Sequence, residues 1–179
     1  ALDQAGDDAR LVFTAHSLPL SMAAACDYEA QLREASRLIA ERLGRHEFDL
    51  VWQSRSGPPT MPWLEPDIND HLEELAANGT SRVVIIPVGF ISDHMEVIYD
   101  LDTEAVATAE RLGMQLVRAA TVGTDPRFVS MIVELVEERR SSGPRRALGG
   151  LEIRPDFCRP DCCPAPQRPG RPPAPVSAD

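Results

Sequence analysis

Short, almost wholly apolar runs alternate with longer amphipathic segments along the first 140 residues of the chain. The apolar runs are predicted strands, at residues 11–15, 48–54, 82–88 and 114–119. The amphipathic segments are predicted helices, at residues 27–44, 67–79 and 93–112 and from Asp125 onward. Strands separated by helices of this length are parallel and joined by right-handed crossovers. The pattern therefore predicts an α/β fold, a doubly wound parallel sheet of about four strands in a three-layer, Rossmann- or flavodoxin-like arrangement.

Composition divides the chain into four segments. The 179 residues are 43% hydrophobic, which is enough for one domain with a core. Residues 1–10 are short and polar and are predicted to be a linker, while residues 11–140 carry the strands and helices. We expect an arginine-rich segment with a cysteine cluster at 141–163, and a disordered, proline-rich tail at 164–179.

Charge and motifs argue against several classes of partner. The formal net charge is −10, which disfavours nucleic acid. No apolar run approaches the roughly 20 residues of a membrane-spanning helix, and the first residues lack the pattern of a signal peptide. No GxGxxG or Walker A motif is found, so no nucleotide cofactor is expected. These features predict a cytoplasmic protein without a transmembrane segment.

Polar side chains with useful chemistry follow three of the predicted strands. Ligands of open parallel sheets bind at the carboxyl ends of the strands, so these loops are expected to share one cleft. The candidates are His16 after the first strand, Arg55 after the second, and Ser92, Asp93, His94 and Glu96 after the third.

His16 has two interpretations. One is a loop histidine that is hydrogen-bonded to the backbone. The other is a functional imidazole, because a neutral ring at the end of a strand can bind a metal such as Fe²⁺ or accept a proton near neutral pH.

Glu96 also has two interpretations. With Asp93 it has the spacing of a capping box, which would account for both residues. However, Glu96, Asp100 and Glu104 recur every four residues, which places three carboxylates on one helix face with no basic residue between them. Such a series suits cations or protons in transit, and an ordinary acidic surface is the alternative. His94 is expected on another side of the helix, in a supporting position.

The loop between the second strand and its helix is rich in proline and contains Trp63. It is either a rigid loop whose tryptophan packs on the sheet edge or a preformed wall for a flat macrocycle. Arg55 in the same loop has the geometry to pair with a ligand carboxylate.

Three long motifs carry a resemblance to a known family: FTAHSLPLS (13–21), VWQSRSGPPTMPWLEPDI (51–68) and PVGFISDHMEVIYDLDTEA (87–105). In this order and spacing they resemble the ferrochelatases, and among them the bacterial branch that acts on coproporphyrin III. The resemblance covers roughly residues 10–140. It implies a chelatase fold of two similar domains, of which this chain supplies the second, with the N-terminal domain as a missing partner.

The resemblance also implies roles for the candidate residues. His16 and Glu96 are the expected catalytic and metal-binding pair, one taking pyrrole protons and the other handling iron. Asp100 and Glu104 would continue a proton or metal relay. The supporting residues would be Ser92, Asp93 and His94, and the porphyrin cleft would contain Arg55 and Trp63. Ferrous iron and a porphyrin would be substrates, and the product would be Fe-coproporphyrin III in haem biosynthesis.

Three cysteines, Cys158, Cys162 and Cys163, are too closely spaced for the usual paired zinc motif. Three thiolates suit a soft metal or an iron–sulfur cluster, and free reduced thiols are the alternative. The resemblance implies a [2Fe–2S] cluster whose fourth ligand lies in the N-terminal half. Cys26 is expected to be a small core residue.

Two other functions stay open at this point. The chain could be a non-catalytic fragment that binds a metal or a porphyrin. It could also be a small cobaltochelatase-like enzyme, which would share the fold and a cleft histidine. Its sheet or its last helix could expose a surface meant for the missing half.

Overall fold

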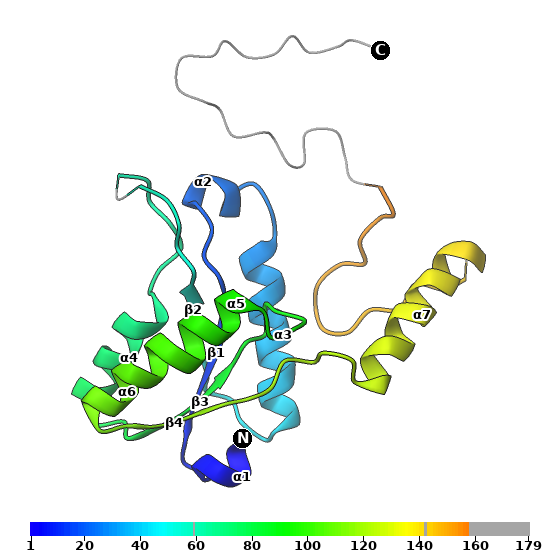
Figure 1. The fold of residues 1–179 in the computed structure, drawn as a ribbon. Helices are drawn as coiled ribbons and strands as arrows, with labels where there is room; N and C mark the ends of the chain where they lie inside the picture. Colours follow the sequence, from blue (N-terminus) through cyan, green and yellow to red (C-terminus); the bar gives the residue numbers. More distant parts are fainter. Residues whose placement is uncertain (59, 142, 158–179) are drawn as a thin grey trace.

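The computed structural model describes residues 1–58, 60–141 and 143–157. Its centre is a sheet of four parallel strands, in the order β2-β1-β3-β4 (Figure 1). The strands are β1 (Arg10–His16), β2 (Asp49–Gln53), β3 (Arg82–Ile86) and β4 (Gln115–Arg118). The predicted doubly wound parallel α/β sheet is thereby confirmed, and all four strands fall where the apolar runs predicted them.

Helices cover both faces of the sheet and enclose two cores. On one face lie α1 (Leu2–Ala5) and α3 (Tyr28–Arg42), and on the other lie α4 (Ile68–Ala77), a π-helix η1 (Ile98–Ala105) and α6 (Val106–Leu112) (Figure 1). Successive strand side chains enter opposite cores, as the two-residue period of a strand requires. Val83 and Val84 of β3 do so, at 0% and 2% exposure, which agrees with the prediction of a strand buried on both faces.

The predicted helix at 93–112 differs in its start and its interior. It begins later, with the three-residue helix α5 (Met95–Val97), continues as η1 and ends as α6. A π-helix is rare and is found mostly at functional sites, where its wider i→i+5 bonding re-aims side chains. The apolar periodicity found the buried residues Leu101 and Ala105 but cannot distinguish π from α bonding.

The first residues of the described chain are folded and partly buried, whereas its last helix is exposed. Residues 1–10, predicted as a linker, contain α1, and Ala5 and Ala9 are buried at 3% and 0% exposure. The short helix α2 (Leu20–Ala23) follows β1. None of the residues of α7 (Pro126–Ser141), all of which the structure describes, is buried, and this helix stands beside the sheet (Figure 1).

The segment after α7 folds back onto α3. The Gly150 amide donates to Glu34 at 2.7 Å, and Arg154 pairs with Asp27. Within the described residues, no helix has the length and apolar character needed to cross a bilayer. The predicted cluster ligands Cys158, Cys162 and Cys163, and the predicted tail at 164–179, lie outside the described residues.

Candidate functional site

His16 is the last residue of β1 and stands at the carboxyl end of the sheet. Its ring Nδ1 lies 2.6 Å from the carbonyl oxygen of Ser17. Because a carbonyl oxygen can only accept, Nδ1 carries the hydrogen, and the lone pair of the neutral ring is on Nε2. The backbone-bonded interpretation of His16 therefore holds for Nδ1, while the functional interpretation stays a prediction for Nε2.

The backbone that carries His16 is also fixed. The hydroxyl of Tyr28 donates to the His16 carbonyl oxygen at 3.0 Å, and Oγ of the buried Ser17 donates to the Leu64 carbonyl oxygen at 2.9 Å. Burial raises the pKa of Tyr28, so the phenol stays a hydrogen donor across the ordinary pH range. The imidazole thus has a defined position at the strand end.

Glu96, in the short helix α5 that follows β3, lies close to this ring. Its Oε1 lies 3.7 Å from Nε2 of His16, with the two side chains 52% and 31% exposed. When the ring is neutral both atoms are acceptors, so no hydrogen bond joins them directly. A proton on the ring or a cation shared by the pair would connect them, which is the arrangement expected of a site that handles protons and metal ions.

Two neighbours fix the backbone of Glu96. His94 caps α5, and its Nδ1 accepts the Glu96 amide hydrogen at 3.2 Å, while Gln53 Nε2 donates to the Glu96 carbonyl oxygen at 3.0 Å. His94 therefore supports Glu96 directly, whereas the sequence placed it on another side of the helix. The predicted capping pair of Asp93 and Glu96 is wrong, because Asp93 pairs with Arg118.

Asp100 is tied to the end of β2. Gln53, only 1% exposed, also approaches Asp100 Oδ2 at 3.4 Å, and the Ser54 hydroxyl donates to the same oxygen. Ser54 has φ 60°, a left-handed conformation that is uncommon for a side chain other than glycine. Glu96 and Asp100 therefore both contact Gln53, while Glu104, further along η1, is exposed.

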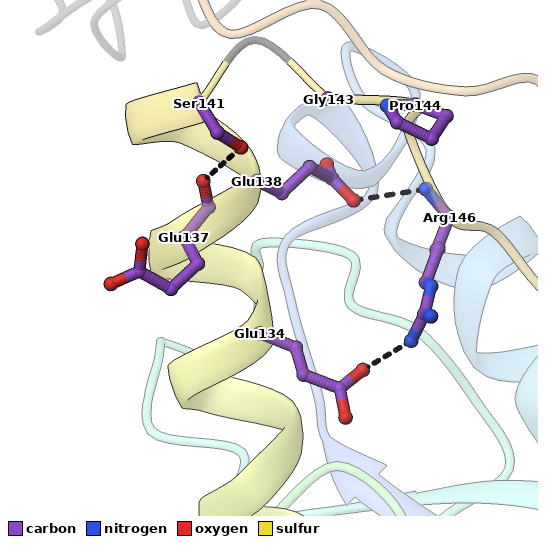
Figure 2. Close-up of a pocket in the computed structure, with 7 residues that line it drawn as sticks. All are labelled: Glu134, Glu137, Glu138, Ser141, Gly143, Pro144 and Arg146. Atoms are coloured by element: carbon purple, nitrogen blue, oxygen red, sulfur yellow. Dashed lines mark hydrogen bonds and ion pairs between the residues drawn. The ribbon is translucent and has the colours of Figure 1, made fainter.

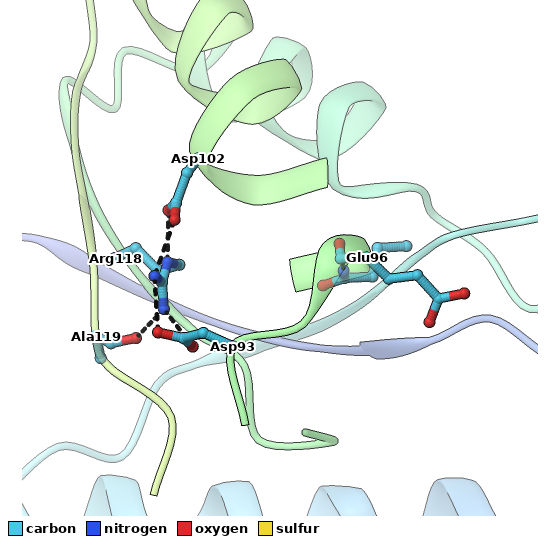
Figure 3. A network of polar contacts seen from close by, with 6 residues as sticks. Asp93, Glu96, Asp102, Arg118 and Ala119 are labelled. Carbon is cyan, nitrogen blue, oxygen red and sulfur yellow. Dashed lines mark hydrogen bonds and ion pairs between the residues drawn. The ribbon is translucent and has the colours of Figure 1, made fainter. Parts of the chain in front are cut away.

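A second polar network lies on the other side of Glu96 (Figure 3). Arg118, the last residue of β4, binds Asp102 through Nε at 2.5 Å and Asp93 through Nη1 at 3.1 Å. The hydrogen bonds to Asp102 raise the pKa of Arg118, and those to Asp93 act in the same direction. Sequence reasoning missed Arg118 and Gln53, although each lies one residue before the end of a predicted strand and could have been found by that position.

The remaining predicted residues lie in the loops around the pair. Ser92 is exposed, and its carbonyl oxygen accepts the His94 amide hydrogen at 3.0 Å. Arg55 bonds within its own loop, with Nη2 3.3 Å from the Met61 carbonyl oxygen and Nη1 3.5 Å from Glu65. Arg55 is therefore partly engaged in holding its loop.

Trp63 is 9% exposed and packs against Gly57 of the same loop. A Cβ at Gly57 would lie 2.5 Å from the indole Nε1, so only glycine permits this packing. The loop is also paired with the segment after β1, through a bridge between Trp63 and Pro19. These contacts fit a preformed wall, built around a tryptophan that is mostly covered.

A hollow of about 450 Å³ lies elsewhere, between α7 and the segment that follows it (Figure 2). Arg146 spans it, with Nη1 2.5 Å from Glu134 and its amide 2.9 Å from Glu138. None of the predicted site residues that the structure describes lines this hollow. Arg146 satisfies Glu134 and Glu138 there, and Glu137 pairs with Arg140, so we assign the hollow no part in the site.

The described residues do not form a closed metal cage. No group of three or more His, Cys, Asp or Glu side chains among them converges closely enough to hold an ion. Cys26, expected in the core, is exposed and free. The candidate site is thus an open pair, His16 and Glu96, with the end of β2 bonded to the Glu96 backbone through Gln53.

Comparison with known proteins shows which curated proteins this chain is similar to. The coproporphyrin III ferrochelatase of Nocardia farcinica is 52% identical over 175 residues, covering 90% of this chain and 49% of that protein. The coproporphyrin III ferrochelatase of Mycolicibacterium smegmatis is 47% identical over 167 residues, covering 87% of this chain and 49% of that protein. The chain therefore spans about half the length of the curated relatives it matches.

A solved structure shares the fold at low sequence identity. A protein from Marinobacter aquaeolei, described as a CbiX protein of cobalamin biosynthesis, superimposes with a TM-score of 0.50 at 15% identity. The match covers 75% of this chain and 98% of that one. The model of the ferrochelatase family matches residues 1–140. The chain belongs to the ferrochelatase family.

Proposed function

We propose that this chain is the C-terminal half of a lyase that inserts Fe²⁺ into coproporphyrin III in haem biosynthesis, with His16 and Glu96 as its reacting pair. The observation that carries the proposal is the 3.7 Å separation of His16 Nε2 and Glu96 Oε1 at the carboxyl end of the sheet. Relatives about 50% identical that bear this activity in their names support the choice of substrate.

The reaction needs two proton acceptors and a route for a cation. Two pyrrole N–H protons must leave the ring as one hydrated Fe²⁺ sheds water and binds four nitrogens. Nε2 of His16 has the lone pair needed to take a proton or to bind the metal, and the Glu96 carboxylate would do the complementary task. Because two ligands alone hold an ion loosely, iron can pass on to the porphyrin nitrogens.

Asp100 and Glu104 would extend the pair along η1. Gln53 Nε2 donates to the Asp100 carboxylate at 3.4 Å and to the Glu96 backbone carbonyl oxygen at 3.0 Å, so both residues lie close to the end of β2. The exposed Glu104 would then exchange protons or metal ions with solvent. Arg55 and Trp63, with the missing N-terminal half, would bound the porphyrin.

The [2Fe–2S] cluster stays a prediction. Cys158, Cys162 and Cys163 would supply three thiolates and the N-terminal half the fourth. The role of the cluster would be structural or regulatory, because metal insertion transfers no electrons. Anaerobic purification followed by absorbance and EPR of the reduced protein would test it.

An absorbance assay tests the proposed reaction. Under anaerobic conditions, Fe²⁺ and coproporphyrin III are mixed with this chain, alone and joined to the N-terminal half of the Nocardia farcinica relative. We expect the joined protein to convert the free-porphyrin spectrum to a metalloporphyrin spectrum. His16→Ala should lower kcat by about 100-fold or more, the scale of losing a general base.

His46→Ala is the matched control, because His46 lies in the exposed loop before β2. It should leave kcat within about twofold. Equal activity of His16→Ala and the unaltered protein would overturn the assignment of the pair. Porphyrin binding without conversion, in a joined protein shown to be folded, would favour the binding-fragment alternative. The same assay with protoporphyrin IX decides between the two porphyrins.

A further inference from the structure

Arg118 makes an unusually complete set of contacts for a residue near the surface. Its guanidinium binds both oxygens of Asp102, at 2.5 and 2.9 Å, and both oxygens of Asp93, at 3.1 and 3.3 Å. Its Nη1 also donates to the carbonyl oxygen of Ala119 at 3.2 Å. The Arg118 side chain is 15% exposed, so solvent screens these contacts less than those of an ordinary surface ion pair.

The two partners of Arg118 bracket Glu96 along the chain (Figure 3). Asp93 lies in the loop before α5, and Asp102 lies inside η1. A single guanidinium thus joins the start of the segment that carries Glu96 to a point beyond it. Without the cation, two carboxylates would face each other with like charges, which would push the loop and η1 apart.

The segment between these partners is anchored on its core side by Val97 and Leu101, both 0% exposed, whereas its outer side is open. α5 is three residues long, and Ile91 and Met95 are 60% and 74% exposed. The loop is also attached to the chain after β4 by the Gly123 amide, which donates to the Ile91 carbonyl oxygen at 2.7 Å, and by hydrogen bonds between Asp93 and Thr121. Arg118 differs from these contacts because it also reaches Asp102, beyond Glu96.

We propose that Arg118 is a positioning residue, which sets the place of Glu96 opposite His16 by clamping Asp93 and Asp102 to the end of β4. The inference rests on the proposed function for its catalytic consequence, but the clamp itself does not depend on it. Arginine is required because its planar fork can bind two carboxylates at once, whereas lysine offers one compact charge on a flexible stem.

Arg118→Lys tests the clamp, because it keeps the charge and removes the fork. Hydrogen–deuterium exchange of peptides over residues 91–104 is the first measurement. We expect exchange about tenfold faster there than in the unaltered chain, with β1 and α3 unchanged, since loosening should stay local. Arg127→Lys is the matched control, because the Arg127 side chain also pairs with an aspartate, Asp125, but is 92% exposed. This change should leave the exchange rate over residues 91–104 unaltered.

Kinetics of the joined protein are the second measurement. Arg118→Lys should lower kcat by about 10- to 100-fold, the usual effect of removing a group that orients a metal-site residue, with KM for the porphyrin within about twofold. Asp102→Asn should lower kcat similarly, and adding it to Arg118→Lys should cause little further loss, because both changes break one link.

The outcomes separate the two proposals. Unchanged exchange over residues 91–104 in Arg118→Lys would overturn the clamp, whether or not the protein turns over. Faster exchange with kcat unchanged would also overturn it, because Glu96 would then not depend on Arg118. Faster exchange in a joined protein that never forms a metalloporphyrin would refute the proposed function and leave the clamp standing.

Discussion

Gly89 lies so close to β1 that any side chain there must move the strand that carries His16. The Gly89 amide donates to the Thr14 carbonyl oxygen at 3.1 Å. A Cβ built at Gly89 would meet Ala15 Cβ at 2.6 Å and Ala15 Cα at 2.9 Å. Carbon atoms pack best about 3.5–4.0 Å apart, so Gly89→Ala requires a displacement of about 1 Å.

The displacement has two consequences of calculable size. Overpacking a tight core site costs about 1–3 kcal/mol of unfolding free energy. Ala15 immediately precedes His16, so much of the 1 Å shift should reach the imidazole. A misplacement of that size can lower kcat by about 100-fold, because the reacting atoms leave their productive separation.

Urea unfolding followed by tryptophan fluorescence measures the first consequence, and the porphyrin absorbance assay measures the second. For a slope of about 2 kcal/mol per molar urea, a loss of 2 kcal/mol lowers the midpoint by about 1 M. Ala15→Gly in the same chain removes the 2.6 Å contact and should restore part of both losses, although the 2.9 Å contact with the backbone remains.

Gly150→Ala is the control for this prediction. Its new Cβ would meet only Glu34 Oε1, at an ordinary 3.8 Å, so the midpoint should shift by less than about 0.3 M. If Gly89→Ala behaves like Gly150→Ala, or if Ala15→Gly fails to restore either quantity, then steric contact between the β3 loop and β1 is not what positions His16.

Two further predictions concern the supports of the sheet. Burial alone would raise the pKa of Asp49, but hydrogen bonds from Arg10 and His71 outweigh it and hold the pKa below its usual value. The carboxylate therefore stabilises the fold at pH values above its unfolded pKa near 3.9. Asp49→Asn should lower the free energy of unfolding by about 2 kcal/mol at pH 7. The difference in stability between this variant and the unaltered chain should shrink as pH falls below about 4. A difference in urea midpoint that grows on acidification would contradict this. Tyr28→Phe removes the 3.0 Å bond to the His16 carbonyl oxygen and should cost about 1 kcal/mol; a urea midpoint equal to that of the unaltered chain would contradict this.

The alternation of apolar runs and amphipathic segments was sufficient to predict the sheet and its covering helices. It also predicted that His16 and Glu96 come close at the carboxyl end of the sheet, because the carboxyl ends of parallel strands must meet at one edge. These inferences needed only local periodicity and a general rule of topology. For the same reason, the ferrochelatase motifs could be placed on the fold before any coordinates.

Residue spacing along the sequence gave a wrong prediction where a side chain binds a distant partner instead of a local one. Asp93 and Glu96 have the spacing of a capping box, yet Asp93 binds Arg118, 25 residues away, and His94 caps the helix instead. The guanidinium of Arg118 bears a full charge and binds both oxygens of Asp93, whereas a backbone amide would offer one uncharged donor, so the tertiary contact is the stronger one. No spacing rule connects positions that far apart.

The sequence by itself determined the fold class, the family and which candidate residues lie at the carboxyl ends of the strands. Only the tertiary structure decided how the pair is held: Nδ1 of His16 against Ser17, and the backbone of Glu96 between Gln53 and His94. It also decided that residues 98–105 form a π-helix. The physical reason is that the spacing of apolar residues along the chain predicts which residues become buried. Side-chain hydrogen bonds instead depend on distances between strands that come together only after folding.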